Sequence, residues 1–134
     1  MIIKRLPPEW LESTNEALRE LLALPPNWGS YGAAPIRVES VMAAIDLLRA
    51  IMQDDSPAPA VVPTSQGLVQ LEWHRDGVDL EIEVQSLGKY SAYFKNSHTG
   101  ETWEKEIDWD LSWLIDCISA LSKTQRATVP YAQR

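Results

Sequence analysis

The stretch GLVQLEWHRDGVDLEIEVQ, residues 67–85, alternates apolar and polar side chains on both sides of an Asp76-Gly77 pair. A period of two is typical of a half-buried strand. Asp-Gly tolerates the positive φ angles of a tight hairpin turn. The stretch therefore predicts two antiparallel strands that meet at Asp76-Gly77, with an apolar face toward the core and a polar face outside.

The segments before and after this hairpin predict further strands, which extend it into a sheet. They also predict helices before and after the strands in the sequence. Period-two segments predict three more strands, which cover 60–62, 89–95 and 101–107. Period-3.6 apolar spacing predicts helices from Pro7-Pro8-Glu9 to about Leu24, with Leu11, Leu18, Leu21 and Leu22 as its buried stripe, and from about Arg37 to Gln53. Asp108 is the expected N-cap of a third helix that ends near Ser122.

This order predicts one α+β domain over residues 1–122, with two N-terminal helices, a four- to five-stranded antiparallel meander and a C-terminal helix. Because only one sheet face is apolar, we expect the helices to cover that face alone. Residues 123–134 have no hydrophobic periodicity and are expected to form a flexible tail.

The polar face of the hairpin is acidic. The parity of the turn places Glu72 on the same side as the carboxylates of the next strand, which are Asp79, Glu81 and Glu83. Like charges on facing strands destabilise a sheet. The plainest interpretation is a solvated face that limits aggregation; a docking site for a Lys/Arg-rich partner or oxygen ligands for a hard cation are the alternatives.

Other chemically active side chains give no recognisable catalytic or metal motif. His74 lies at the hairpin shoulder beside Glu72 and Asp76, but this set is too small for a transition-metal site. Cys117 lies on an apolar helical arc and is expected to be a small buried hydrophobe. No nucleophile, phosphate-binding or zinc-protease motif occurs, so we predict no catalytic residue, no metal and no cofactor.

Two aromatic segments can be either structural or functional. In the loop PPNWGSYGAAP, residues 25–35, Trp28 and Tyr31 either plug the end of the helical layer or form a recognition surface with Asn27 and Ser30. In the third helix, Trp109 and Trp113 lie away from the main apolar stripe. Another helix of the chain, a second subunit or a partner protein is expected to cover them, which leaves a homodimer possible.

Charge and hydropathy exclude several classes of protein. Nineteen Asp and Glu residues against 12 Lys and Arg residues give a net charge of −7, which disfavours nucleic-acid binding and favours a basic partner. The chain starts without the apolar segment of a signal peptide and lacks an apolar run long enough to span a membrane. We expect a cytoplasmic protein without a membrane partner.

Two motifs resemble those of a family of small uncharacterised bacterial proteins. The first is the loop Asn27-Trp28-Gly29-Ser30-Tyr31-Gly32-Ala33 with Pro35, and the second is Pro63-Thr64 with Gly67 followed by Leu71-Glu72-Trp73. The likeness covers about residues 24–84, and Gly29 stands where many such sequences carry Asp. The resemblance implies a standalone bacterial domain and no particular activity.

These observations favour a small acidic, non-enzymatic protein-binding module, such as an adaptor, a neutraliser or a chaperone, whose partner is a protein, with a basic protein as the candidate. The alternative is a small-molecule-binding or enzymatic domain with a pocket lined by Trp28, Tyr31 and Trp73.

Overall fold

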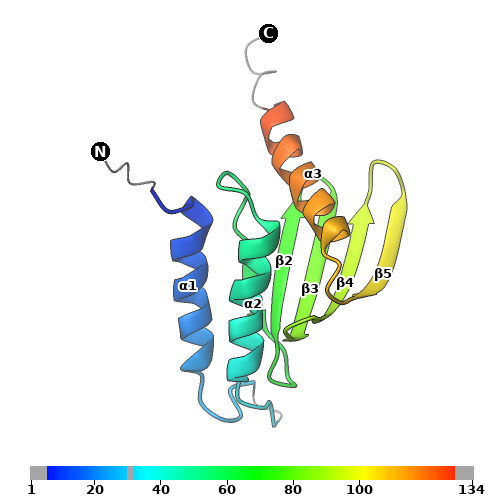
Figure 1. The fold of residues 1–134 in the computed structure, drawn as a ribbon. Helices are drawn as coiled ribbons and strands as arrows, with labels where there is room; N and C mark the ends of the chain where they lie inside the picture. The colour runs from blue at the N-terminus through cyan, green and yellow to red at the C-terminus, as the bar shows by residue number, and fades with distance from the viewer. Residues whose placement is uncertain (1–5, 30–31, 129–134) are drawn as a thin grey trace.

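A computed structural model describes residues 6–29 and 32–128, with the side chains of 123–128 excepted, and confirms the predicted fold class. Two helices precede a five-stranded antiparallel meander, and a third helix follows it (Figure 1). The elements are α1 (Glu9–Leu22), α2 (Val38–Ile51), β1 (Ala60–Pro63), β2 (Val69–Arg75), β3 (Val78–Ser86), β4 (Lys89–Asn96), β5 (Glu101–Ile107) and α3 (Ser112–Thr128).

The sheet keeps sequence order, β1-β2-β3-β4-β5, with every neighbouring pair antiparallel. The β2–β3 turn has two residues, Asp76 with φ 49° and Gly77 with φ 79°, as a tight hairpin requires. Arg75 faces Val78 across this turn, and this pairing sets the β2–β3 register. The hairpin predicted from the sequence is confirmed.

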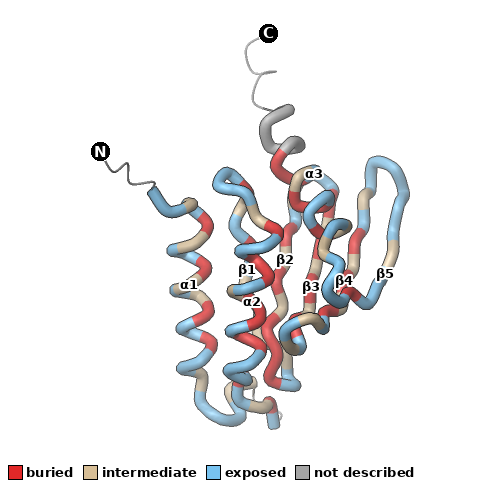
Figure 2. The backbone as a smooth tube through the Cα atoms, viewed as in Figure 1, coloured by how far each residue is buried: buried red, intermediate tan, exposed pale blue. Residues whose placement is uncertain are grey.

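All three helices lie on the same side of the sheet (Figure 1). The buried side chains gather between the two layers, on α2 and on the facing side of the strands (Figure 2). Ser40 of α2 is fully buried and accepts a hydrogen bond from the Val69 amide while it donates one to the Val84 carbonyl. This hydroxyl joins α2 to both central strands.

Helix α1 buries a different stripe from the predicted one. Trp10, Thr14, Leu18 and Leu21 are buried, whereas Leu11 is only partly buried and Leu22 is exposed. The Trp10 indole donates to the Gln53 carbonyl just after α2, and this bond rotates α1 toward its aromatic residue. The positions of α1 and α2 in the sequence were predicted correctly.

Helix α3 begins and ends later than the sequence indicated. Asp108 is not its cap; the Asp108 carboxylate accepts a hydrogen bond from the Asp110 amide, in a turn that precedes the helix. The Asp110 carboxylate instead accepts from the Ser112 amide and hydroxyl at the first turn. The backbone of α3 continues to Thr128, so 123–128 is helical rather than a tail, and 129–134 lie outside the described residues.

Among the described helices, none is both long enough and apolar enough to cross a membrane.

Candidate functional site

The side of the sheet opposite the helices is open, and no element of residues 6–29 or 32–128 covers it (Figure 1). We call this side the open face. Its polar side chains align in cross-strand rows, because antiparallel partners point to the same side. The rows are Glu72–Glu81–Tyr93–Glu104, Gln70–Glu83–Ser91–Glu106 and His74–Asp79–Lys95–Thr102. The predicted gathering of Glu72, Asp79, Glu81 and Glu83 on one face is confirmed.

The first two rows border a hollow of about 410 Å³ on the open face. We call it the acidic hollow. Its lining combines four carboxylates with one aromatic ring, neutral groups and one lysine, and consists of Gln70, Glu81, Glu83, Ser91, Ala92, Tyr93, Glu104, Lys105 and Glu106. The Lys105 ammonium lies over the Trp113 ring. The Ser91 hydroxyl lies 3.0 and 2.7 Å from the two carboxylate oxygens of Glu106 and fixes that side chain at the rim.

The carboxylates of the open face repel one another. Glu72 and Glu81 are direct cross-strand partners, so their Cβ atoms are about 5 Å apart. Partial burial raises the pKa of Glu81, and the negative charge of Glu72 raises it further. The repulsion among these carboxylates is therefore an electrostatic cost to the protein, and the fold does not require carboxylates at these positions.

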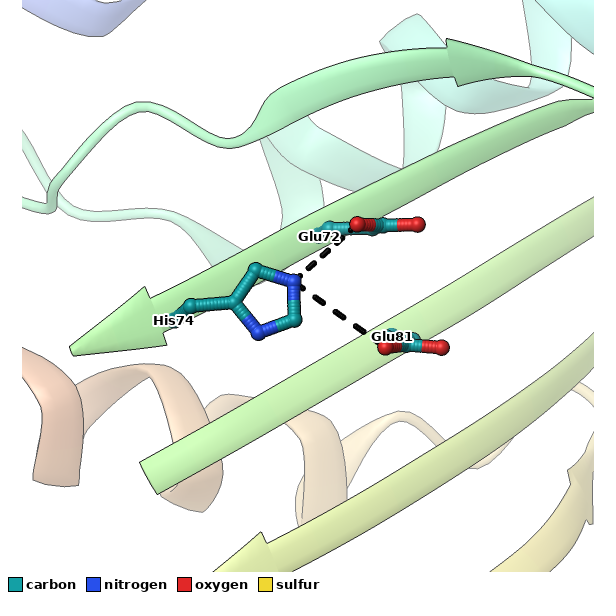
Figure 3. A group of neighbouring side chains, drawn as sticks. All are labelled: Glu72, His74 and Glu81. Carbon is teal, nitrogen blue, oxygen red and sulfur yellow. Dashed lines mark hydrogen bonds and ion pairs between the residues drawn. The ribbon is translucent and has the colours of Figure 1, made fainter. Parts of the chain in front are cut away.

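His74 joins three carboxylates at one end of the open face. Its Nδ1 lies 2.7 Å from Oδ1 of Asp79, and its Nε2 lies 3.0 Å from Oε1 of Glu72 and 4.0 Å from Oε2 of Glu81. Figure 3 shows the same ring nitrogen directed at Glu72 and Glu81. Hydrogen bonding to Asp79 and then to Glu72 raises the pKa of His74.

Of the two carboxylates predicted beside His74, one is confirmed and the other is wrong. Glu72 is a partner, but Asp76 lies in the turn, where its carbonyl bonds His98. Asp79 takes its place because the two-residue turn sets His74 opposite Asp79 in the register.

Most of the described aromatic loop is held by its own hydrogen bonds. Asn27 has φ 61°, and its side-chain oxygen accepts from the Gly32 amide. The half-buried Trp28 donates its indole N–H to the Ala34 carbonyl. This arrangement agrees with the interpretation that the loop plugs the end of the helical layer; Ser30 and Tyr31 lie outside the described residues.

The structure does not bring the alternative pocket residues together. Trp73 is 2% exposed, and its indole donates to the Pro57 carbonyl, beyond the C-terminal end of α2. Trp28 instead bonds Ala34, before the N-terminal end of α2. Helix α2 has 14 residues, so the two indoles lie at ends of the helical layer that are about 20 Å apart.

The two tryptophans proposed as an interface have different environments. Trp113 lies against the Trp103 ring, and the Lys105 ammonium lies 4.0 Å from the Trp113 ring centroid. This side chain is therefore engaged within its own chain. Trp109 is 71% exposed and lies against the backbone of Gly88 in the β3–β4 turn. Of the pair, Trp109 is the one that remains accessible to a partner.

Cys117 is buried, as the sequence predicted. Burial, with a smaller contribution from the Asp116 charge, raises its pKa to about 12. A thiol with so high a pKa is almost entirely protonated at neutral pH, so it is a poor nucleophile.

Sequence reasoning missed the half of the open face that lies beyond β3. Tyr93, Ser91, Glu104 and Glu106 were placed on strands but were not assigned to the acidic face. The necessary signal was the β3–β4 register, which depends on the turn at Leu87-Gly88 together with a register shift between Val84 and Ser86. With that register, Tyr93 and Ser91 continue the rows of Glu81 and Glu83.

A scan against protein-family models finds no match to the chain. Searches of the curated proteins and of the solved structures also find no significant match. The resemblance to the bacterial family stays a prediction based on residues 24–84, and the function has to be argued from the geometry of the open face.

Proposed function

We propose that the protein is a small non-enzymatic binding module whose open face takes up a Lys/Arg-rich segment of a partner protein. The observation that carries this proposal is the uncovered acidic hollow. Carboxylates border it on β3 and on β5, on either side of β4, and a chain with net charge −7 attracts basic partners at long range.

The first row supplies a site suited to one basic side chain. Tyr93 stands between Glu81 and Glu104, each its direct cross-strand partner. A Lys or Arg head group placed over the Tyr93 ring gains a cation–π contact and reaches carboxylates on both sides. Arg fits best, because its planar guanidinium stacks on an aromatic ring and binds carboxylates with two parallel hydrogen bonds.

The second row repeats this spacing farther along the strands. Glu83 and Glu106 flank Ser91, and the shift from Tyr93 to Ser91 is two residues, or about 7 Å along β4. An extended peptide places alternate side chains at the same interval. A segment with basic residues at i and i+2 therefore matches the two rows.

The electrostatic cost of the face also supports a binding role. A solvated outer face needs charge for solubility, but it does not need carboxylates in register at partly buried positions. A basic partner would place positive charge beside Glu81 and Glu83. The repulsion among the carboxylates would then be relieved, and this relief makes the free energy of binding more favourable.

The test is capture from the native cell at low salt, followed by titration of any captured protein against matched variants. The double variant Glu83→Lys/Glu104→Lys should lose binding at least about tenfold, because two attractive contacts become repulsive. The control Glu12→Lys/Glu16→Lys makes the same charge change on exposed positions of α1 and should bind nearly as wild type does. Equal losses in both variants, or a complex insensitive to salt and to both, would refute the open-face site.

A further inference from the structure

The His74 end of the open face has the chemistry of a metal site, which shares Glu81 with the proposed peptide-binding face but needs no partner protein. We propose that Glu72, His74 and Glu81 bind one divalent transition-metal ion, with Zn²⁺ as the representative case. From the sequence, His74 was grouped with Glu72 and Asp76, a set too small for a transition-metal site, whereas the structure groups it with Glu72 and Glu81.

The three donor atoms lie near the separation that a metal ion requires, and a small movement of the Glu81 side chain would close the longer distances. One ligand atom from each residue lies within 4.8 Å of the other two. Nε2 of His74 is 3.0 Å from Oε1 of Glu72 and 4.0 Å from Oε2 of Glu81. Ligands at about 2.0–2.1 Å from a tetrahedral Zn²⁺ lie roughly 3.3 Å apart, which falls between these two distances.

A further carboxylate sets the orientation of the imidazole. Asp79 lies 2.7 Å from Nδ1 of His74, so with an ion bound the Nδ1–H would donate to Asp79 and Nε2, which faces Glu72 and Glu81, would give up its proton and bind the ion. Metal-binding histidines commonly have such a carboxylate on their second nitrogen. Asp79 is therefore a positioning residue for the metal ligand.

The donor set selects the class of ion. An imidazole nitrogen suits Zn²⁺, Cu²⁺ or Ni²⁺ better than Mg²⁺ or Ca²⁺, which prefer oxygen ligands alone. Two carboxylates in register also gain when a cation sits between them. With three protein ligands on an open face, the remaining coordination positions are left for water or for a donor group of a partner.

Rigid placement favours the site as well. His74 and Glu72 belong to β2 and Glu81 belongs to β3, so all three ligands are on central strands of the sheet rather than on a loop. Gln70 donates a 2.6 Å hydrogen bond to the second oxygen of Glu72, which orients that carboxylate while Oε1 remains directed at His74.

The test is isothermal titration of the untagged, metal-free protein with Zn²⁺ alone. We expect saturable binding of one ion, weakened at least about tenfold by His74→Gln and by Glu81→Gln, since each removes a ligand, and about tenfold by Asp79→Asn. Two controls should bind as wild type does: Glu83→Gln, which removes the same charge one register step away on the open face, and His98→Gln, which removes the other histidine. Long-range ¹H–¹⁵N spectra should show the perturbation at Nε2 of His74.

Three results would overturn the site: no saturable Zn²⁺ binding, binding that His74→Gln leaves unchanged, or an equal loss with Glu83→Gln and Glu81→Gln, which would indicate diffuse attraction to the acidic face. Circular dichroism of each variant separates loss of the site from loss of the fold. Because the titration uses no partner protein, its outcome is independent of the peptide-binding proposal.

Discussion

Replacing Glu81 by Gln should stabilise the protein. Glu81 faces Glu72 directly across β2 and β3, and like charges in such pairs cost about 0.2–1 kcal/mol. The Glu81 side chain is 34% exposed and Nε2 of His74 is 4.0 Å away, so solvent and the imidazole offset part of the repulsion. We expect a gain of about 0.5 kcal/mol in the free energy of unfolding and a Tm rise of about 2 °C.

Urea denaturation in EDTA measures this gain without metal. The matched control is Glu104→Gln, on the same face but opposite the uncharged Tyr93, and it should gain less. Added salt should shrink the gain, because it screens partly exposed charges.

The gain in stability of Glu81→Gln should also decrease as the pH falls. The pKa of Glu81 is raised in the folded state above its ordinary 4.5, so the penalty in the wild type is fully present above the raised value. The penalty disappears as the pH falls below 4.5, where Glu81 is protonated in both states, and the two proteins should then converge. A loss of stability in Glu81→Gln, or the same gain in Glu104→Gln, would refute the repulsion argument.

Two further predictions concern the core. Ser40→Ala should destabilise the protein by about 2–4 kcal/mol in urea denaturation, because it leaves the buried Val69 amide and Val84 carbonyl without their shared hydroxyl; a change below about 0.5 kcal/mol would contradict this. The Cys117 thiol, whose burial raises its pKa to about 12, should react with a thiol-specific disulfide reagent only after denaturation, and rapid reaction of the native protein would show that it is accessible.

The sequence predicted those parts of the fold that depend on local patterns. Alternation around Asp76-Gly77 was enough to give β2, β3 and the acidic side of both strands, because a turn of either two or four residues places the same side chains on one face. The start of α3 was misplaced because Asp108 and Asp110 are both good capping residues, and only the packing of Trp109 against Gly88 distinguishes them.

The candidate site needed long-range information. Tyr93 and Glu104 join Glu81 only through two successive strand registers, and the first of them includes an irregularity between Val84 and Ser86. The buried stripe of α1 was rotated in the same way, by the bond from Trp10 to a backbone carbonyl 43 residues away. Such contacts depend on the packing of segments that are distant in the chain, so periodicity within one segment cannot locate them.

The most direct test of the open-face proposal is a ¹⁵N-amide titration of the protein with a Lys/Arg-rich peptide that carries basic residues at i and i+2. We expect the largest shift changes on the residues around the acidic hollow, which are Glu81, Glu83, Ser91, Tyr93 and Glu104, and little change on α1 although it also exposes glutamates. Changes that are largest on α1, or spread evenly over both sides of the molecule, would contradict it.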